Sequence, residues 1–290
     1  MKVSVIIVSY NSARFLPGCL ASVFNQIFSD YEIIVIDNNS IDRPLEFIKE
    51  NYPKIKILKN INNLGLCRAN NQGIKMAQGE YVLIMNPDVI LEPGYLEKII
   101  GQAEKLPQGG SFGGKLLRLI NGRKTGIIDS TGLKILSHYK IIDRGAGERD
   151  KGQFNKTEEV FGQTGACVLY RKKAIEEVGL FDEKFFVYKE DIDMAWRLRK
   201  ANWQNWYMPE AVAYHQRYAG VGRERRKRNR LVNYYSYRNH LLLLSKYLDK
   251  KTFWQNAWRI IPYEIGKFIY ILFFETRNIK AFFDFLKLKK

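Results

Sequence analysis

Cysteine and histidine are scarce in this chain, with three of each among 290 residues. The cysteines, Cys19, Cys67 and Cys167, are odd in number and far apart, so neither a disulfide framework nor a cysteine metal cluster is indicated. A reducing compartment is therefore expected. No uncharged apolar run approaches the roughly 18 residues that a transmembrane helix needs. The apolar stretch 3–8 is too short for a secretory signal peptide.

Acidic residues are also few, with 30 against 47 basic ones and a net charge of +17. Residues 1–215 hold 29 Lys or Arg against 25 Asp or Glu, whereas residues 216–290 hold 18 against 5. This asymmetry indicates that the carboxyl-terminal quarter meets a polyanion, either nucleic acid or an anionic membrane. The 17 Phe, 17 Tyr and 5 Trp supply a packed core and exclude disorder.

Apolar runs alternate with helical spacings over the first ninety residues. Strands are expected at 3–8, 32–36, 55–58 and 81–85, and helices at 44–51, at 70–77 and after Asn11 or Ser12, which can cap the first one. This order predicts an α/β fold with an open, mostly parallel sheet and helices on both faces. Ligands of such sheets lie beyond the carboxyl ends of the strands, so the loops 9–12, 37–40 and 86–88 should meet.

The remainder of the chain is less regular. Residues 107–163 are rich in glycine and polar residues, which predicts loops and short antiparallel strands that cover the edge of the sheet. A strand and a helix are expected within 160–178, a helix at 191–201 and a strand at 206–214. Residues 219–290 are expected to form a basic, aromatic helical extension.

Glycine is missing from the first β–α loop, which reads Ser9-Tyr10-Asn11-Ser12. A dinucleotide-binding turn needs glycines so that the backbone can approach a pyrophosphate. An enzyme that uses a nicotinamide or flavin cofactor is therefore not expected.

Two acidic loops follow apolar strands. Asp37 could accept a hydrogen bond from the imide of uracil or thymine or from a ribose hydroxyl, or it could simply cap its turn. The segment Asn86-Pro87-Asp88 could hold Mg²⁺ or Mn²⁺ against a diphosphate, because these cations prefer oxygen ligands, or it could be a plain turn.

Three carboxylates, Glu190, Asp191 and Asp193, stand at the start of a predicted helix. They could supply a general base for a hydroxyl, or they could complement the helix dipole. Asp191 and Asp193 are two residues apart and cannot share a helical face, so different roles are expected. His215 follows the last predicted strand and could bind a metal or phosphate, or be structural.

Together these motifs resemble the family 2 glycosyltransferases, and most closely their bacterial rhamnosyltransferase-like branch. The matching segments, over about residues 3–240, are 5–11 (VIIVSYN), 33–40 (IIVIDNNS), 63–71, 79–88 (GEYVLIMNPD), 165–166, 181–197 and His215. The resemblance implies a GT-A fold over residues 1–218, with a nucleotide-binding half to about residue 106 and an acceptor and catalytic half at 107–218. It also implies an inverting transfer from a UDP- or dTDP-linked sugar, with dTDP-rhamnose as one candidate.

The resemblance assigns roles by position. In the nucleotide site, Tyr10 stacks on the base, Asp37 reads its imide and Arg68 contacts the nucleotide; the other members are Ser9, Asn11, Asn63 and Asn86. Asp88 and His215 hold the divalent metal, Mg²⁺ or Mn²⁺. Asp191 is the catalytic base, and the sugars are contacted by Glu190, Gly165 and Ala166.

Two positions depart from the family pattern. Asn86 replaces an aspartate that many relatives carry, which removes one charge from the metal motif. Asn202-Trp203 replaces the usual Gly-Trp, at a helix end whose left-handed conformation asparagine tolerates.

The positive charge of the carboxyl-terminal extension allows two interpretations. The basic run 223–230 (RERRKRNR), followed by tyrosines, suits nucleic acid, and a nucleic-acid-binding protein without transferase activity is the main alternative. However, the run lies outside the sheet and no nucleic-acid module is visible, so nucleic acid is not an expected partner. The aromatic, aliphatic and basic residues of 253–290 favour an anionic membrane surface, although the same face could pack on the catalytic domain or across a homodimer. The expected location is the inner face of the cytoplasmic membrane, where a glycan or lipid-linked acceptor is met during surface polysaccharide synthesis.

Overall fold

The computed structural model describes residues 1–217 and 222–289, without the side chains of 222–229. Two units make up the chain. The first, the sheet unit, comprises Met1–Lys134, Asp143–Phe186 and Glu190–Arg217. The second, the helical unit, comprises Ile135–Ile142, Val187–Lys189 and Tyr218–Lys290.

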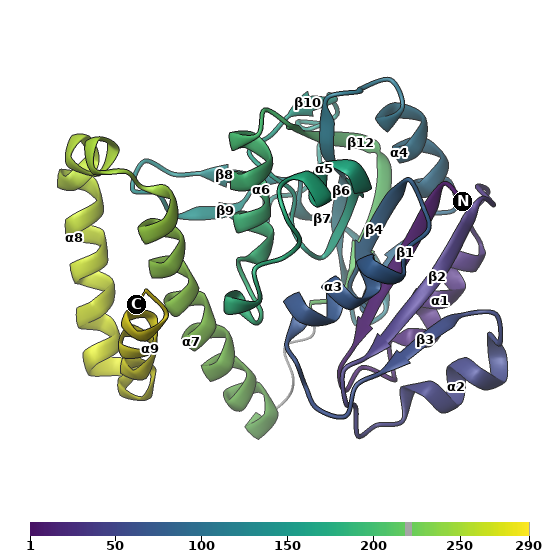
Figure 1. Ribbon diagram of the computed structural model, residues 1–290, viewed down its shortest axis with the longest axis horizontal. Helices are drawn as coiled ribbons and strands as arrows, with labels where there is room; N and C mark the ends of the chain where they lie inside the picture. Colours follow the sequence, from purple (N-terminus) through teal and green to yellow (C-terminus); the bar gives the residue numbers. More distant parts are fainter. Residues whose placement is uncertain (218–221, 290) are drawn as a thin grey trace. The chain divides into compact units, whose positions relative to one another are not determined.

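A ten-stranded sheet forms the centre of the sheet unit (Figure 1), with the main order β10-β12-β6-β11-β4-β1-β2-β3. Its strands are β1 (Val3–Ser9), β2 (Tyr31–Asp37), β3 (Lys56–Lys59), β4 (Tyr81–Met85), β5 (Val89–Leu91), β6 (Gly109–Ile120), β7 (Arg123–Ser130), β10 (Glu158–Glu159), β11 (Cys167–Arg171) and β12 (Gln204–His215). The first four strands are mutually parallel, and so are β6 and β12, whereas β11 runs antiparallel between β4 and β6. The expected open, mostly parallel α/β sheet is confirmed.

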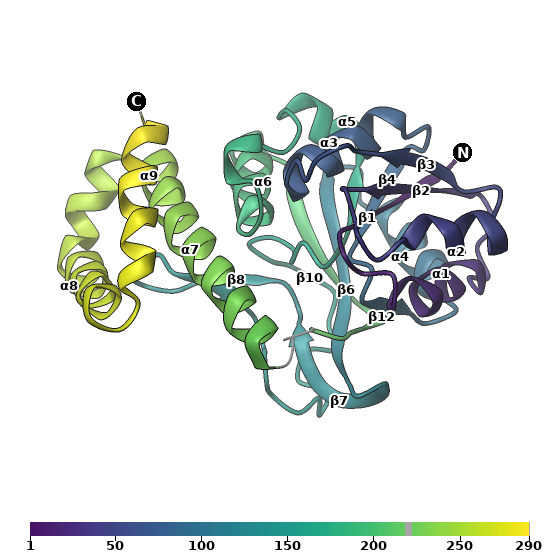
Figure 2. The ribbon, with the colours of Figure 1, turned by 90° about the horizontal axis from the view of Figure 1, so that it is seen from below.

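Helices cover both faces of this sheet. They are α1 (Leu16–Phe24), α2 (Pro44–Asn51), α3 (Leu66–Met76), α4 (Tyr95–Ala103), α5 (Lys172–Glu177) and α6 (Glu190–Lys200). Successive residues of β1 point to opposite faces. Val5 and Ile7 join the core formed with α1, α2 and α4, whereas Ile6 meets α3, where a Cβ on Gly73 would lie 2.6 Å from it. Figure 2 shows α3 on one side of the sheet and α1, α2 and α4 on the other.

The expected cap of the first helix is wrong. Helix α1 begins at Leu16, with a proline in its first turn and no side-chain cap. Asn11 instead has a left-handed φ of 52°, and the Ser12 hydroxyl lies 2.9 Å from that of Ser9. These polar side chains hold the loop, so they are not available to the helix.

The prediction that residues 107–163 cover the edge of the sheet is also wrong. Strand β6 lies inside the sheet, between β12 and β11. Its glycines mark close backbone approaches, since a Cβ on Gly114 would lie 2.1 Å from the Ala211 carbonyl oxygen. Glycine therefore serves strand packing here, although β7 does pair antiparallel with β6, and β8 (Leu133–Ile135) and β9 (Ile141–Asp143) form a separate two-stranded sheet.

The helical unit contains α7 (Gly222–Tyr247), α8 (Lys250–Phe274) and α9 (Ile279–Lys289). Tyr237, Ile271 and Ala281 form its small buried core. Asp249 caps α8 by accepting a 2.8 Å hydrogen bond from the Thr252 N–H. Among residues 1–217 and 222–289, no helix combines the length and the apolarity that crossing a membrane requires.

Candidate functional site

The predicted ligand loops lie at one edge of the sheet. Strands β1 and β2 end together, with Ser9 paired to Asp37, and β4 ends beside β1. The loops are also bonded to each other: the Asn11 N–H donates to the Ser40 hydroxyl at 3.1 Å, and the Ile41 N–H donates to Asn11 Oδ1 at 2.9 Å. The expectation is confirmed for the loops 9–12 and 37–40, and the pairing of β4 with β1 brings the loop 86–88 to the same edge of the sheet.

This edge presents one exposed ring next to buried polar groups. Tyr10 is 50% exposed, so its ring is open to stacking, whereas Ser9 and Asp37 are buried. Asp37 Oδ1 accepts a 3.1 Å hydrogen bond from the Ser40 N–H, which is the turn-capping role considered for it. Its other oxygen receives no hydrogen bond from the described residues, so the cap leaves an acceptor for a ligand.

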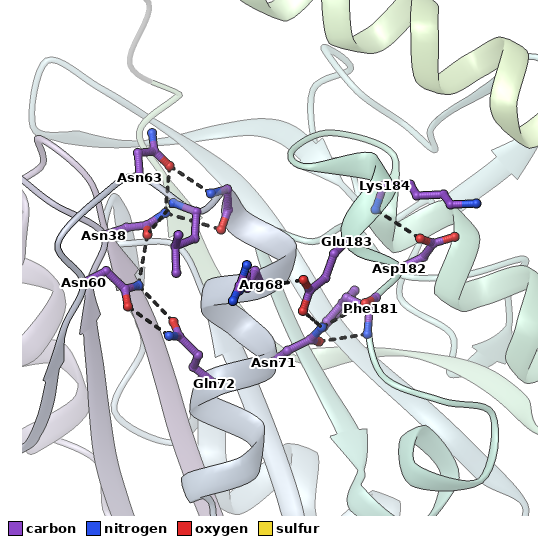
Figure 3. Close-up of polar contacts among 12 residues, drawn as sticks. Asn38, Asn60, Asn63, Arg68, Asn71, Gln72, Phe181, Asp182, Glu183 and Lys184 are labelled. Atoms are coloured by element: carbon purple, nitrogen blue, oxygen red, sulfur yellow. Dashed lines mark hydrogen bonds and ion pairs between the residues drawn. The ribbon is translucent and has the colours of Figure 1, made fainter. Parts of the chain in front are cut away.

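A network of amide side chains supports the neighbouring loop, and sequence reasoning missed most of it (Figure 3). Asn38 donates to Asn63 Oδ1 at 2.9 Å and accepts from Asn60 at 3.1 Å and from the Leu64 N–H at 3.0 Å. Asn60 and Gln72 exchange a reciprocal pair of 2.9 Å bonds. Asn63, predicted at the nucleotide site, is thus also part of the loop's own framework.

Arg68 extends from the first turn of α3 toward Glu183, with 3.8 Å between its Nε and a carboxylate oxygen. Asn71 lies one turn further along. Its side-chain amide donates to the Phe181 carbonyl and accepts from the Phe181 N–H, at 2.9 Å each. Figure 3 shows Arg68 and Asn71 both directed at the segment around Glu183. Arg68 is therefore a half-exposed cation whose carboxylate partner restrains it beside the site.

The two aspartates of α6 have different surroundings, as their spacing predicts. Asp191 accepts a 2.8 Å hydrogen bond from the Gly165 N–H on Oδ2 and another, also 2.8 Å, from the Ile192 N–H on Oδ1. Asp193 is fully buried and pairs with Arg197 within the helix, at 2.8 Å. Asp193 is structural, and Asp191 is a half-buried carboxylate with a fixed orientation.

The segment 165–166 joins the acidic helix to the acidic loop. A Cβ on Gly165 would lie 3.2 Å from Glu190 Oε1, so glycine allows this segment to approach the carboxylates closely. The Ala166 carbonyl accepts a 2.8 Å hydrogen bond from the Asn86 N–H. Gly165, Ala166, Asn86 and the carboxylates of α6 therefore belong to one connected part of the sheet unit.

Asp88 and His215 stand together at the ends of β4 and β12. His215 Nε2 lies 3.3 Å from Asp88 Oδ1, and its Nδ1 lies 2.8 Å from Asp129 Oδ2. Burial opposes the charged form of His215, but hydrogen bonds to Asp129 and Asp88 outweigh this and raise its pKa from 6.5 to about 9. Asp129 is fully buried and also lies 2.6 Å from Arg217 Nε. Sequence reasoning missed Asp129, because no motif surrounds it.

Because the raised pKa leaves His215 protonated at neutral pH, a divalent cation would bind the Asp88–His215 pair by displacing the proton on Nε2. A carboxylate oxygen and an imidazole nitrogen point at each other, and Asp129 holds the second imidazole nitrogen, as the outer partners of metal-bound histidines do. Within the described part of the chain, no three His, Cys, Asp or Glu side chains converge as a metal-binding group. Two protein ligands suit an ion that shares its remaining positions with phosphate oxygens and water.

Comparisons with known proteins place the chain in a family. Residues 4–179 match the model described as glycosyl transferase family 2, and residues 142–282 match that of glycosyl transferase family group 2. The chain belongs to glycosyl transferase family 2. An N-acetylglucosaminyl-diphospho-decaprenol L-rhamnosyltransferase of Mycobacterium tuberculosis is 28% identical over 76% of this chain and 78% of its own length. A poly-beta-1,6-N-acetyl-D-glucosamine synthase of Staphylococcus epidermidis is 26% identical over 73% of this chain and 49% of its own.

Among solved structures, this glycosyltransferase is similar to a crystal structure of GalNAc-T7 with UDP, GalNAc and Mn²⁺. The TM-score is 0.68 at 15% identity, over 86% of this chain and 48% of that one. The likeness confirms the GT-A fold. The nucleic-acid-binding alternative finds no support in these comparisons, and the side chains 223–229 of its basic run lie outside the described residues.

Proposed function

We propose that this glycosyltransferase is an inverting enzyme that moves a sugar from a nucleotide diphosphate to a hydroxyl of a glycan or lipid-linked acceptor in bacterial surface polysaccharide synthesis. The name of the mycobacterial relative supports a lipid-linked acceptor and rhamnose as the sugar. The donor would carry uridine or deoxythymidine, with dTDP-rhamnose as the first candidate.

The orientation of Asp191 is the observation that carries this proposal. Two backbone N–H groups, from Gly165 and Ile192, each bond one of its oxygens. These contacts hold the carboxylate beside Gly165, and a positioned carboxylate is a group that can accept a proton from an acceptor hydroxyl. Asp193, the other aspartate of the helix, is committed to Arg197 and cannot take this role.

The nucleotide would lie on the loops beyond β1 and β2. In this arrangement Tyr10 stacks on the base and the uncapped oxygen of Asp37 accepts the imide N–H of uracil or thymine. Arg68 lies on the side of the phosphates, and Ser9, Asn11, Asn63 and Asn86 line the same edge of the sheet. Tyr10 supports this placement best, because it is a half-exposed ring beside buried polar groups.

Asp88 and His215 would hold Mg²⁺ or Mn²⁺. When bound, the ion neutralises negative charge on the departing diphosphate. Asp129 keeps His215 turned toward Asp88, and Asn86 leaves the motif with one carboxylate. Arg68 adds a second positive group for the diphosphate.

The chemistry is a single displacement. Asp191 removes the proton of the acceptor hydroxyl as its oxygen attacks the anomeric carbon from the face opposite the nucleotide, so the configuration of that carbon inverts. Glu190, Gly165 and Ala166 surround Asp191 and would position the acceptor and donor sugars.

We further propose that residues 1–218 form the catalytic domain, with its nucleotide-binding half to about residue 106 and its acceptor and catalytic half at 107–218. Residues 219–290 would be an extension that brings the enzyme to the inner face of the cytoplasmic membrane, where a lipid-linked acceptor is found. Such an enzyme would work from the cytoplasm as a peripheral membrane protein.

A panel of nucleotide sugars, scored for metal-dependent protection against thermal unfolding and for transfer, tests the function. We expect a pyrimidine nucleoside diphosphate to bind with Mg²⁺ or Mn²⁺, and Asp37→Ala with Asp88→Ala to lose this binding. Asp30→Ala is the matched control, because Asp30 is exposed at the opposite end of β2. Undiminished binding by the double variant refutes the site, and preference for NAD refutes the class.

A further inference from the structure

Helix α8 exposes a continuous apolar stripe along its whole length. Its members follow the helical repeat and are 39% to 70% exposed: Trp254, Trp258, Ile261, Ile265, Ile269 and Leu272. We call these six residues the α8 stripe. Phe273 and Phe274, 70% and 77% exposed, follow at the carboxyl end of the helix and lie on other faces than the α8 stripe. An apolar surface this long marks an interaction site rather than scattered surface residues.

The opposite face of α8 is already occupied inside the helical unit. Ile260 and Ile271 are buried, and the Tyr263 ring lies 4.2 Å from that of His138. Glu264 pairs with the buried His240 at 2.6 Å. At 100° per residue Ile260, Tyr263 and Ile271 lie on the far side of the helix from the α8 stripe, and Glu264 lies on its flank. The ring contact and the hydrogen bond fix the rotation of α8, so the α8 stripe cannot turn inward to join the core.

The charges around the α8 stripe favour an anionic partner. Residues 250–290 contain nine Lys or Arg and three Asp or Glu. Lys250, Lys251 and Arg259 are exposed, and the Arg259 guanidinium lies 4.3 Å from the centre of the Trp258 ring. Aromatic rings beside cations suit the boundary between lipid headgroups and acyl chains. A second copy of this chain would instead bring together two molecules of net charge +17.

We propose that α8 lies flat on an anionic membrane, with the α8 stripe inserted at the acyl boundary and the neighbouring cations at the level of the lipid phosphates. The helix has 25 residues, so the contact would extend over about 37 Å at about 1.5 Å per residue. Insertion of α8 would be the physical basis of the proposed peripheral location. It rests on the proposed function in one respect, namely that the acceptor is lipid-linked.

Flotation of the full-length protein with phosphatidylglycerol-containing and pure phosphatidylcholine vesicles tests the proposal. We expect binding to the anionic vesicles and a loss of roughly tenfold or more for Ile265→Glu, since insertion of a charge opposes apolar burial. Ile27→Glu is the matched control, because Ile27 is an equally apolar, 67% exposed residue of the sheet unit and the substitution adds the same charge. Melting curves should show both variants folded, because both positions are exposed.

A spectroscopic measurement separates insertion from simple adsorption. Tryptophan fluorescence should shift to the blue on anionic vesicles, and Trp254→Phe with Trp258→Phe should abolish the shift while retaining flotation. Part of the binding should persist at about 0.5 M salt, where charge attraction is screened over a few ångströms. Complete loss of binding at that salt would overturn insertion of the α8 stripe.

Other results would overturn the proposal in favour of a named alternative. If Ile265→Glu floats as well as the unmodified protein, the α8 stripe does not contact lipid. If the protein binds neither kind of vesicle and Ile265→Glu converts a dimer to a monomer, the α8 stripe is the interface with a second copy of this chain. Transfer to a water-soluble acceptor analogue should be unchanged in Ile265→Glu, so failure of this inference is distinguishable from failure of the proposed function.

Discussion

Replacing Asp191 by asparagine should separate the catalytic role of this carboxylate from its structural one. Asparagine keeps the shape, but it has only one oxygen to accept from the two N–H groups of Gly165 and Ile192. The lost hydrogen bond should cost about 1 kcal/mol of stability, a fall of about 2–4 °C in Tm for a chain of this size. Loss of the general base should lower kcat by about 10²- to 10⁴-fold, which corresponds to about 3–5 kcal/mol of activation free energy.

Asp193→Asn is the contrasting variant. It neutralises a fully buried partner of Arg197, and breaking such a pair costs about 3–5 kcal/mol. We therefore expect a much larger fall in Tm for Asp193→Asn, with kcat per folded molecule nearly retained. Product release from a radiolabelled nucleotide sugar, read together with thermal melting and donor binding, distinguishes the two variants.

The outcome that refutes this reasoning is specific. If Asp191→Asn transfers sugar normally while Glu190→Gln does not, the base is Glu190 and the orientation of Asp191 has another purpose. If both single variants lose the donor as well as turnover, the first turn of α6 belongs to the donor site instead.

Three other predictions follow from buried contacts. Asp129→Asn should weaken Mn²⁺ binding by about 10- to 100-fold in a metal titration, because Asp129 orients His215; unchanged affinity would remove it from the metal site. Asn239→Ala should lower Tm more than Asn233→Ala. Asn239 is fully buried and its amide donates to the Val187 and Tyr188 carbonyls at 2.9 and 2.7 Å, whereas the hydrogen bond of Asn233 is exposed. Equal falls in Tm would contradict this prediction. Burial, with lesser contributions from Lys189 and Lys140, lowers the pKa of Lys267 from 10.5 to about 8, against the opposing effect of Glu264. Between pH 8 and pH 10.5 the unfolded chain therefore binds more protons than the folded one. The free energy of unfolding of the wild-type protein should consequently rise with pH over this range. Lys267→Met should consequently be the more stable protein near pH 7, with an advantage that shrinks above pH 8 in denaturant titrations, and a pH-independent difference would contradict the burial effect.

Much of the nucleotide-binding edge could be predicted because its signals are local. Strands β1, β2 and β4 are continuous apolar runs, which burial on both faces requires, and each ends in a polar turn. Parallel pairing then brings Ser9 beside Asp37 without further information. Even the left-handed end of α6 was readable, since Asn202 has a φ of 63°.

The second half of the sheet was less predictable because its signals depend on partners distant in sequence. The glycines of β6 resemble those of a loop until Ala211 of β12 is placed against Gly114. Asp129 is an isolated acid in a weakly patterned strand, and only the pairing of β12 with β6 and of β6 with β7 brings it to His215. The role of Asn38 likewise needs the three loops that its amide joins.

By itself the sequence determined which residue types occupy the strand ends, the acidic start of α6 and the basic, aromatic carboxyl-terminal quarter, because spacing and composition are properties of the chain. Tertiary structure alone decided which of these groups remain available for chemistry. Asp191 and Asp193 are residues of the same type. Asp193 is buried and paired with Arg197, whereas two backbone N–H groups orient Asp191. Likewise, the helical repeat of α8 allows either apolar face to be buried, and the ring contact of Tyr263 with the hydrogen bond of Glu264 selects the one that faces inward. Availability depends on contacts between distant segments, and a linear pattern does not contain them.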